Sequence, residues 1–207
     1  MKIKSLRMGA LLAAAAIAAG GVTALTSTGA GAAATVNTFS LVRSTGSVAA
    51  QCLTTAKATV KVQTQGQTEV MTIDATGLPK NTGFDVFITQ VPDAPFGIAW
   101  YQGDLQSDST GVAHGQYKGR FSIETFAVAP GAAPAPVVHP GKDASTNPAF
   151  APVHMFHVGI WFDSAAASAA AGCANVVTPF NGDHTAGPQA MSTRQFAPTA
   201  GPLRRLP

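Results

Sequence analysis

Apolar and polar residues alternate along two neighbouring segments, 58–63 and 70–75, in the first half of the chain. A period of two residues is typical of a β-strand with one buried face and one face in water. The sequence Gln65-Gly66-Gln67 between the segments is typical of a turn. The pattern therefore predicts a β-hairpin.

Short apolar runs separated by turn residues continue along the chain. The run 84–91 alternates again, with Phe84, Val86 and Ile88 on one face. Further strands are expected at 98–101, 112–117, 120–128 and 189–196, and segment 33–47 is either a first edge strand or a loose arm. Strands at this spacing predict a sandwich or a barrel.

The longest run of large apolar residues lies at 153–163 and is expected to be a central strand of the sheet. It carries His154 and His157. Residues three apart in a regular strand point to opposite faces, so the strand prediction counts against the pair chelating one ion.

Three other segments depart from the strand pattern. Five prolines within 129–151 predict an exposed insertion between strands. The alanine-rich run 165–171, with Ser164 as N-cap and Gly172 as its stop, predicts the only helix expected after the leader. Residues 201–207 are expected to form a short C-terminal tail that frays.

The first 34 residues have the composition of a signal peptide. Lys2, Lys4 and Arg7 precede an apolar segment, and small residues around 30–34 offer cleavage sites near Ala32 to Ala34. An uncleaved membrane anchor is the alternative interpretation. Cleavage would leave a single domain over 35–200, with no membrane span, in a secreted protein.

The net charge of +3 comes from this leader. Taking its three basic residues from the thirteen in the chain leaves ten, which balance the ten acidic residues. A neutral mature chain lacks the basic footprint of a protein that binds nucleic acid. Nucleic acid and anionic membranes are therefore excluded as expected partners.

The chain has two cysteines, Cys52 and Cys173. In an exported protein we expect them to form one disulfide, with free reactive thiols as the alternative. The bond would close a loop of more than a hundred residues, and the chain-entropy model assigns such a loop about 4 to 5 kcal/mol of stability.

Histidines are the main candidates for metal chemistry. The candidate ligands are His154, His157 and His114, and a site would need one of the first two beside a distant His114, His139, His184 or Asp163. We favour structural, hydrogen-bonded roles for these histidines, because their spacing matches no metal motif. No cofactor is predicted.

Other polar residues suggest weaker alternatives. Asp183-His184 with a serine would make a hydrolase triad, but there is no Gly-x-Ser-x-Gly motif and a polar turn is favoured. Asp104 and Asp108 could bind Ca²⁺, but a solvated turn is favoured. Trp100-Tyr101 could form an aromatic platform, although core or sheet-edge packing is favoured, and Glu124 needs only a surface position.

The block 74–87, with its Gly-Leu-Pro turn, and the Asp-x-x-Gly turn at 108–111 resemble secreted bacterial immunoglobulin-like β-sandwich domains. The resemblance covers about residues 58–121. It implies an all-β, immunoglobulin-like antiparallel sandwich, here with one short helix and the proline-rich insertion, and it carries over no catalytic residue.

The sequence therefore predicts a secreted, non-enzymatic β-sandwich that binds partners or associates with the cell envelope. The expected partner is an extracellular protein or a cell-wall polymer, contacted through loops 129–151 or 104–111. The alternatives are an exported metal-binding protein that uses His154 or His157 and a hydrolase in which His184 or Asp163 meets a serine. The pattern predicts no particular oligomeric state.

Overall fold

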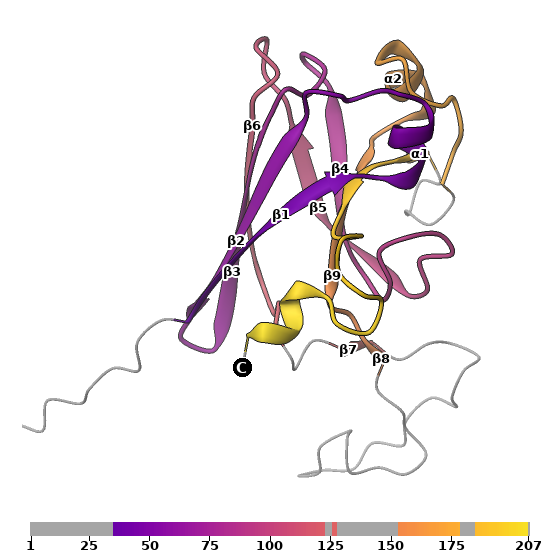
Figure 1. Cartoon of the computed structure of the whole chain (residues 1–207). Coiled ribbons are helices and arrows are strands. Elements are labelled where there is room, and N and C mark those ends of the chain that lie inside the picture. Colours follow the sequence, from indigo (N-terminus) through magenta and orange to yellow (C-terminus); the bar gives the residue numbers. More distant parts are fainter. Residues whose placement is uncertain (1–34, 123–125, 128–152, 179–184, 207) are drawn as a thin grey trace, which may run out of the picture. The chain divides into compact units, whose positions relative to one another are not determined.

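The computed structural model describes residues 35–122, 126–127, 153–178 and 185–206 (Figure 1). This part of the chain is mostly antiparallel β-sheet, which confirms the predicted all-β class. The strands are β1 Val36–Arg43, β2 Lys57–Gln65, β3 Thr68–Thr76, β4 Gly83–Thr89, β5 Ala99–Gln106, β6 Ala113–Gly119, β7 Phe126–Ala127, β8 Val153–His154, β9 His157–Phe162 and β10 Gln189–Ser192. The helices are α1 Thr45–Ala49, α2 Ala165–Ala170 and the 3₁₀ helix η2 Pro202–Arg205.

The predicted hairpin is present as β2 and β3. The two strands pair in an unbroken antiparallel register from Lys57 opposite Thr76 to Gln65 opposite Thr68, and Gly66 adopts φ 65° in the turn. Their apolar residues are buried except for half-buried Val70, and most of their polar residues are at least partly exposed, as the alternation predicted.

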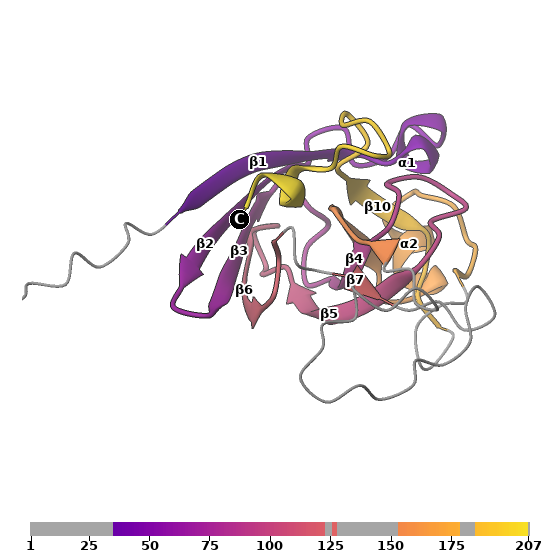
Figure 2. The same cartoon turned by 90° about the horizontal axis from the view of Figure 1, so that it is seen from below.

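Strand β1 joins two halves of one eight-stranded sheet, whose order is β5-β4-β9-β10-β1-β2-β3-β6. Residues 36–41 pair with β2, whereas Val42 and Arg43 pair with β10. The segment is therefore a first strand, as one interpretation held, but it lies inside the sheet and not at its edge. Figure 2 shows the strands of both halves arranged around a common centre.

The core fills the inside of this curled sheet. Phe84, Val86 and Ile88 of β4 pack in one buried cluster with residues of β9 and of β2 and β3. At the seam between β5 and β6, the Tyr117 hydroxyl donates to the Asp104 carbonyl at 2.8 Å. Cβ atoms at Gly103 and Gly115 would collide with this ring, so both positions require glycine to keep the seam closed.

The half made of β4, β9 and β10 is buried on both of its faces. Every residue of β9 and β10, and all of β4 except Gly83, is buried. On the outer face, the Trp161 ring lies 5.2 Å from Phe87 and 5.0 Å from Phe96, measured between centroids. The loop 90–98 carries Phe96 over this face, and Gln189 Nε2 holds it by donating to the Pro92 carbonyl at 3.1 Å.

The long apolar run 153–163 is not one strand. It divides at Met155-Phe156 into β8, which pairs with β7, and β9, which lies in the main sheet. The backbone N–H of Leu203 donates to the Phe156 carbonyl at 3.2 Å, so the C-terminal segment is hydrogen-bonded to the chain at the break. The same docking buries Leu203 and Leu206, which are at most 1% exposed, and shows that the expectation of a frayed tail was wrong.

Other strand bounds also differ from the prediction. Strand β5 runs on to Gln106, so Asp104 lies in a strand instead of a loop, and β10 ends at Ser192 before a turn at 193–196. A single strand was predicted at 120–128, and among the described residues of this range only β7 is a strand. Phe121 is buried but lies outside any strand. The prediction also missed the short helix α1, whose N-cap Ser44 accepts from the Ser47 N–H at 3.0 Å.

The predicted alanine-rich helix and disulfide are confirmed. Ser164 caps α2 by accepting from the Ala167 N–H at 3.1 Å, and Gly172 follows the helix with φ 74°. Cys173 then bonds to Cys52 across 121 residues of sequence. No helix among the described residues has the length and apolar character needed to cross a membrane.

Replacing both cysteines with alanine is expected to lower the free energy of unfolding by about 2 to 5 kcal/mol, because the unfolded chain is released from a long closed loop. Urea unfolding followed by tryptophan fluorescence measures the change. The wild-type protein should lose a similar amount in a reducing agent, whereas the variant should be insensitive to it. Two reactive thiols in the unreduced, denatured wild-type protein would contradict the pairing.

Candidate functional site

The described histidines do not come together. His114 lies exposed on β6 with Nδ1 2.7 Å from Asp74 Oδ1, and the exposed ring of His154 stacks on Phe156 with centroids 5.2 Å apart. Within the described ranges, no three residues of the types His, Cys, Asp and Glu are grouped so that they could hold a metal ion. His139 and His184 lie outside the described residues.

His157 is buried and has a structural position. Its Nε2 lies 3.1 Å from the Pro198 carbonyl, which can only accept, so Nε2 is the protonated nitrogen. The Nδ1 atom of the neutral ring then accepts from the Thr193 hydroxyl at 2.9 Å. Burial lowers the pKa of His157, while the carbonyls of Pro198 and Ala197 and the charge of Asp93 oppose that shift in part. The ring thus ties β9 to the segment after β10.

The candidate carboxylates have local partners. Asp104 accepts a hydrogen bond from the Tyr101 hydroxyl, and burial together with this carboxylate raises the pKa of Tyr101 to about 12. Asp108 Oδ1 accepts from the Thr110 hydroxyl and N–H, both at 2.7 Å, and from the Val112 N–H at 3.0 Å. The Thr110 hydroxyl is the largest cause of the lowered pKa of Asp108, followed by these backbone donors. Asp108 therefore forms the turn that was favoured over a calcium loop.

The remaining candidates divide between packing positions and the part of the chain that is not described. Trp100 is partly buried against the core, which agrees with the favoured packing role, while Tyr101 is 49% exposed at the sheet edge. Asp163 accepts from the Ser164 hydroxyl at 3.1 Å beside the N-cap of α2. Glu124, Asp183 and the insertion 129–151 lie outside the described residues.

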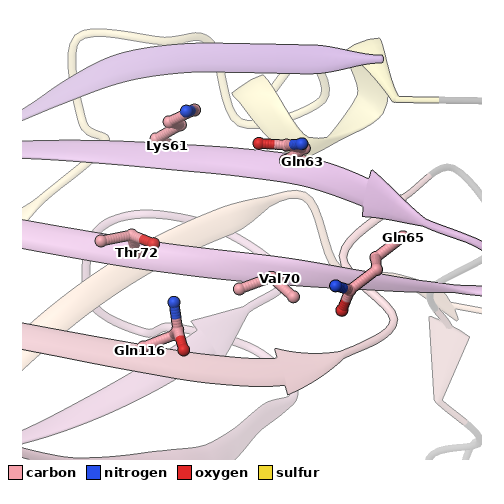
Figure 3. Close-up of a pocket in the computed structure, with 6 residues that line it drawn as sticks. All are labelled: Lys61, Gln63, Gln65, Val70, Thr72 and Gln116. Carbon is pink, nitrogen blue, oxygen red and sulfur yellow. The ribbon is translucent and has the colours of Figure 1, made fainter. Parts of the chain in front are cut away.

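A polar groove that the sequence analysis did not identify lies on the outer face of β2, β3 and β6. Its volume is about 330 Å³. Figure 3 shows side chains of the middle strand β3 lying between longer side chains from β2 on one side and β6 on the other. The lining residues are Lys61, Gln63, Gln65, Val70, Thr72 and Gln116.

The strand register explains the shape of the groove. Lys61, Thr72 and Gln116 form one row across the three strands, and Gln63, Val70 and Lys118 form the next. Neighbouring strands lie about 4.8 Å apart, so the long side chains of β2 and β6 flank the short β-branched ones of β3 over roughly 10 Å. The result is a trough that runs along β3.

The chemistry of the trough suits a polar ligand. Glutamine amides both donate and accept hydrogen bonds, whereas the Lys61 ammonium group only donates. Half-buried Val70 adds an apolar spot to the floor. Asp74 and His114 face each other in the next row along β3 and β6. Their side chains contact each other and do not line the groove. The six lining side chains can therefore bind hydroxyl, amide or acidic groups along an extended molecule.

Alternation alone could have marked Lys61 and Gln63 as outward-facing residues. It could not have identified the groove, because every half-buried strand presents polar residues to water. The groove also needs the pairing of β3 with β6, and these strands are separated by the whole of β4 and β5.

His157 predicts the direction of a pH effect on stability. Its pKa in the folded chain lies below the ordinary value of 6.5, so the unfolded chain binds a proton first as the pH falls through 6.5. The free energy of unfolding should therefore decrease between pH 7.5 and 5.5. The variant His157→Gln keeps a donor near Pro198 and should show a smaller decrease in the free energy of unfolding. Urea unfolding at the two pH values measures this decrease. An equal decrease in both proteins would contradict the assignment, because His114 and His154 are present in both.

Comparisons with known proteins identify no relative of this chain. A scan against protein-family models and searches of curated proteins and of solved structures found no match. The function is therefore inferred from the groove and from the residues around it.

Proposed function

We propose that the protein is an exported, non-enzymatic binding module whose binding site is the groove on β2, β3 and β6. The observation that carries the proposal is a solvent-exposed trough lined by three glutamines, a threonine and a lysine. None of these side chains forms a nucleophile and base pair of the kind that hydrolases use, and their common property is hydrogen bonding. Their chemistry therefore favours binding over catalysis.

Export is supported by two features. The leader-like composition of residues 1–34 would direct secretion, and the disulfide between Cys52 and Cys173 is of the kind that persists in oxidising compartments. We also propose that the two halves of the curled sheet act as the layers of an immunoglobulin-like sandwich. The shared core supports this, and many sandwiches have the architecture without the strand order of antibody domains.

An extended polymer of the cell envelope fits the groove better than a folded protein does. Protein interfaces have centres rich in buried aromatic and apolar side chains, and the groove has Val70 as its single apolar residue. A trough along one strand can instead accept a linear chain, with amides on both flanks to bind its hydroxyl groups. The proposed contact is thus a sheet face and not the loop 104–111, whose Asp108 is occupied by its own turn.

Replacing Gln63 and Gln116 with alanine together is expected to weaken binding to bacterial cell-wall sacculi by about tenfold or more. The two amides flank the groove, and each lost hydrogen bond costs on the order of 1 kcal/mol. Co-sedimentation of purified protein with sacculi measures the change in affinity.

A matched control combines Ser40→Ala with Thr59→Ala. These residues are exposed and pair with each other on β1 and β2, but they do not line the groove. The control should bind as the wild type does. Failure of the wild type to sediment with sacculi, or equal losses in both double variants, would overturn the proposed site.

A further inference from the structure

The charges around the groove identify the class of its ligand. We propose that the groove binds an acidic polysaccharide, a hydroxyl-bearing polymer whose repeat units carry carboxylate or phosphate groups. This inference rests on the proposed function and specifies the ligand of the same site.

The outer face of β2, β3 and β6 carries an excess of positive charge. Lys61 and Lys118 are exposed on β2 and β6, in the two rows that form the groove. The one exposed acid on these strands, Asp74, is in contact with His114 Nδ1 at 2.7 Å. Glu69 is only 3% exposed and is turned to the inside, where its carboxylate accepts from the Phe121 N–H at 2.8 Å. A ligand on this face therefore meets ammonium groups that no neighbouring carboxylate in the groove neutralises.

The C-terminal segment also carries cations, but they have partners of their own. It follows β1, where Asn37 Nδ2 donates to the Pro202 carbonyl at 2.7 Å and Gln195 Nε2 donates to the Ser40 carbonyl at 2.6 Å. The same segment carries Arg194, Arg204 and Arg205. Arg194 Nε donates to the Arg43 carbonyl at 2.8 Å, Arg204 Nη1 donates to the Thr199 carbonyl at 3.3 Å, and the Arg205 guanidinium group lies over the Phe196 ring, so these three cations are not part of the groove.

Four of the acidic residues in the described ranges lie outside this face. Asp85 and Asp104 lie on β4 and β5, Asp163 follows β9, and Asp93 lies in the loop that covers the outer face of β4 and β9. An excess of exposed lysines beside the groove steers an anionic ligand to it even when the net charge is zero.

The positions of the lysines match a chain that lies along β3. Lys61 stands on the β2 flank in the row of Thr72, and Lys118 stands on the β6 flank in the row of Val70. An acidic polymer in the trough passes between the two cations, with glutamine amides beside it for its hydroxyl groups. None of the lining residues is aromatic, so the groove lacks the stacking platform on which single-stranded nucleic acids bind.

The test measures affinity by isothermal titration calorimetry with three polymers of similar length. Polygalacturonate carries carboxylates, dextran phosphate carries phosphates, and dextran is neutral. At least one acidic polymer should bind ten times more tightly than dextran, and its affinity should fall when NaCl is raised from 50 to 300 mM. Binding of one acidic polymer alone identifies carboxylate or phosphate as the preferred group.

The double variant Lys61→Gln with Lys118→Gln should weaken binding of the preferred acidic polymer about tenfold. The control Lys57→Gln with Lys80→Gln removes the same charge at exposed positions that do not line the groove, and it should bind within twofold of the wild type. Thermal unfolding of both variants checks that they fold as the wild type does.

Several results would overturn the inference. Dextran binding as tightly as the acidic polymers, equal effects of the two lysine variants, or equally tight binding of a single-stranded oligonucleotide would each reject an acidic polysaccharide. Loss of binding to sacculi in the variant Gln63→Ala with Gln116→Ala, together with retained binding in Lys61→Gln with Lys118→Gln, is a separate outcome. That result would keep the groove as the binding site and would reject an acidic ligand. If both variants bind sacculi as tightly as the wild type does, the groove itself is rejected as the binding site.

Discussion

The packing of Trp161 and Phe87 on the outer face of β9 and β4 determines which surface of the sheet meets water. Their ring centroids lie 5.2 Å apart, and Phe96 from loop 90–98 lies over Trp161. These three aromatic rings exclude solvent from the outer face of β4 and β9. The face of β2, β3 and β6 is left as an exposed surface of the sheet, and that is where the groove forms.

Strand β1 connects the covered half to the exposed half. It pairs with β10 at one end and with β2 along the rest of its length. The C-terminal segment then docks beside β1, where Asn37 donates to the Pro202 carbonyl and Gln195 donates to the Ser40 carbonyl. One topological feature, a strand shared by both halves, therefore connects the covered aromatic face to the face that holds the polar trough.

The sequence predicted those features that depend on neighbouring residues. The hairpin of β2 and β3, the N-cap of Ser164 and the stop at Gly172 all follow from local patterns, and the disulfide followed because the chain has two cysteines. The break at Met155-Phe156 could not be predicted, because it accompanies a contact with Leu203 far along the chain. The same holds for β1, whose second partner β10 lies almost 150 residues away.

The candidate site was harder to predict than the fold. The histidines were the main candidates in the sequence because their side chains can bind metals and transfer protons. In the structure, however, buried His157 is hydrogen-bonded to Thr193 and Pro198, and His114 contacts Asp74. Net charge is an average over the chain, so it could not show that Lys61 and Lys118 lie on the two flanks of one groove. The groove emerges when residues of β2 and β6 are brought to the two sides of β3.

Binding in the groove can be located by the change in backbone amide NMR shifts when polygalacturonate oligomers are added to the isotopically labelled protein. The account predicts that the largest changes follow the trough, at Gln63, Val70, Thr72 and Gln116, and that β4 and β9 change little. Changes concentrated in loop 90–98 and in the strands beneath it, with the groove unaffected, would contradict the account.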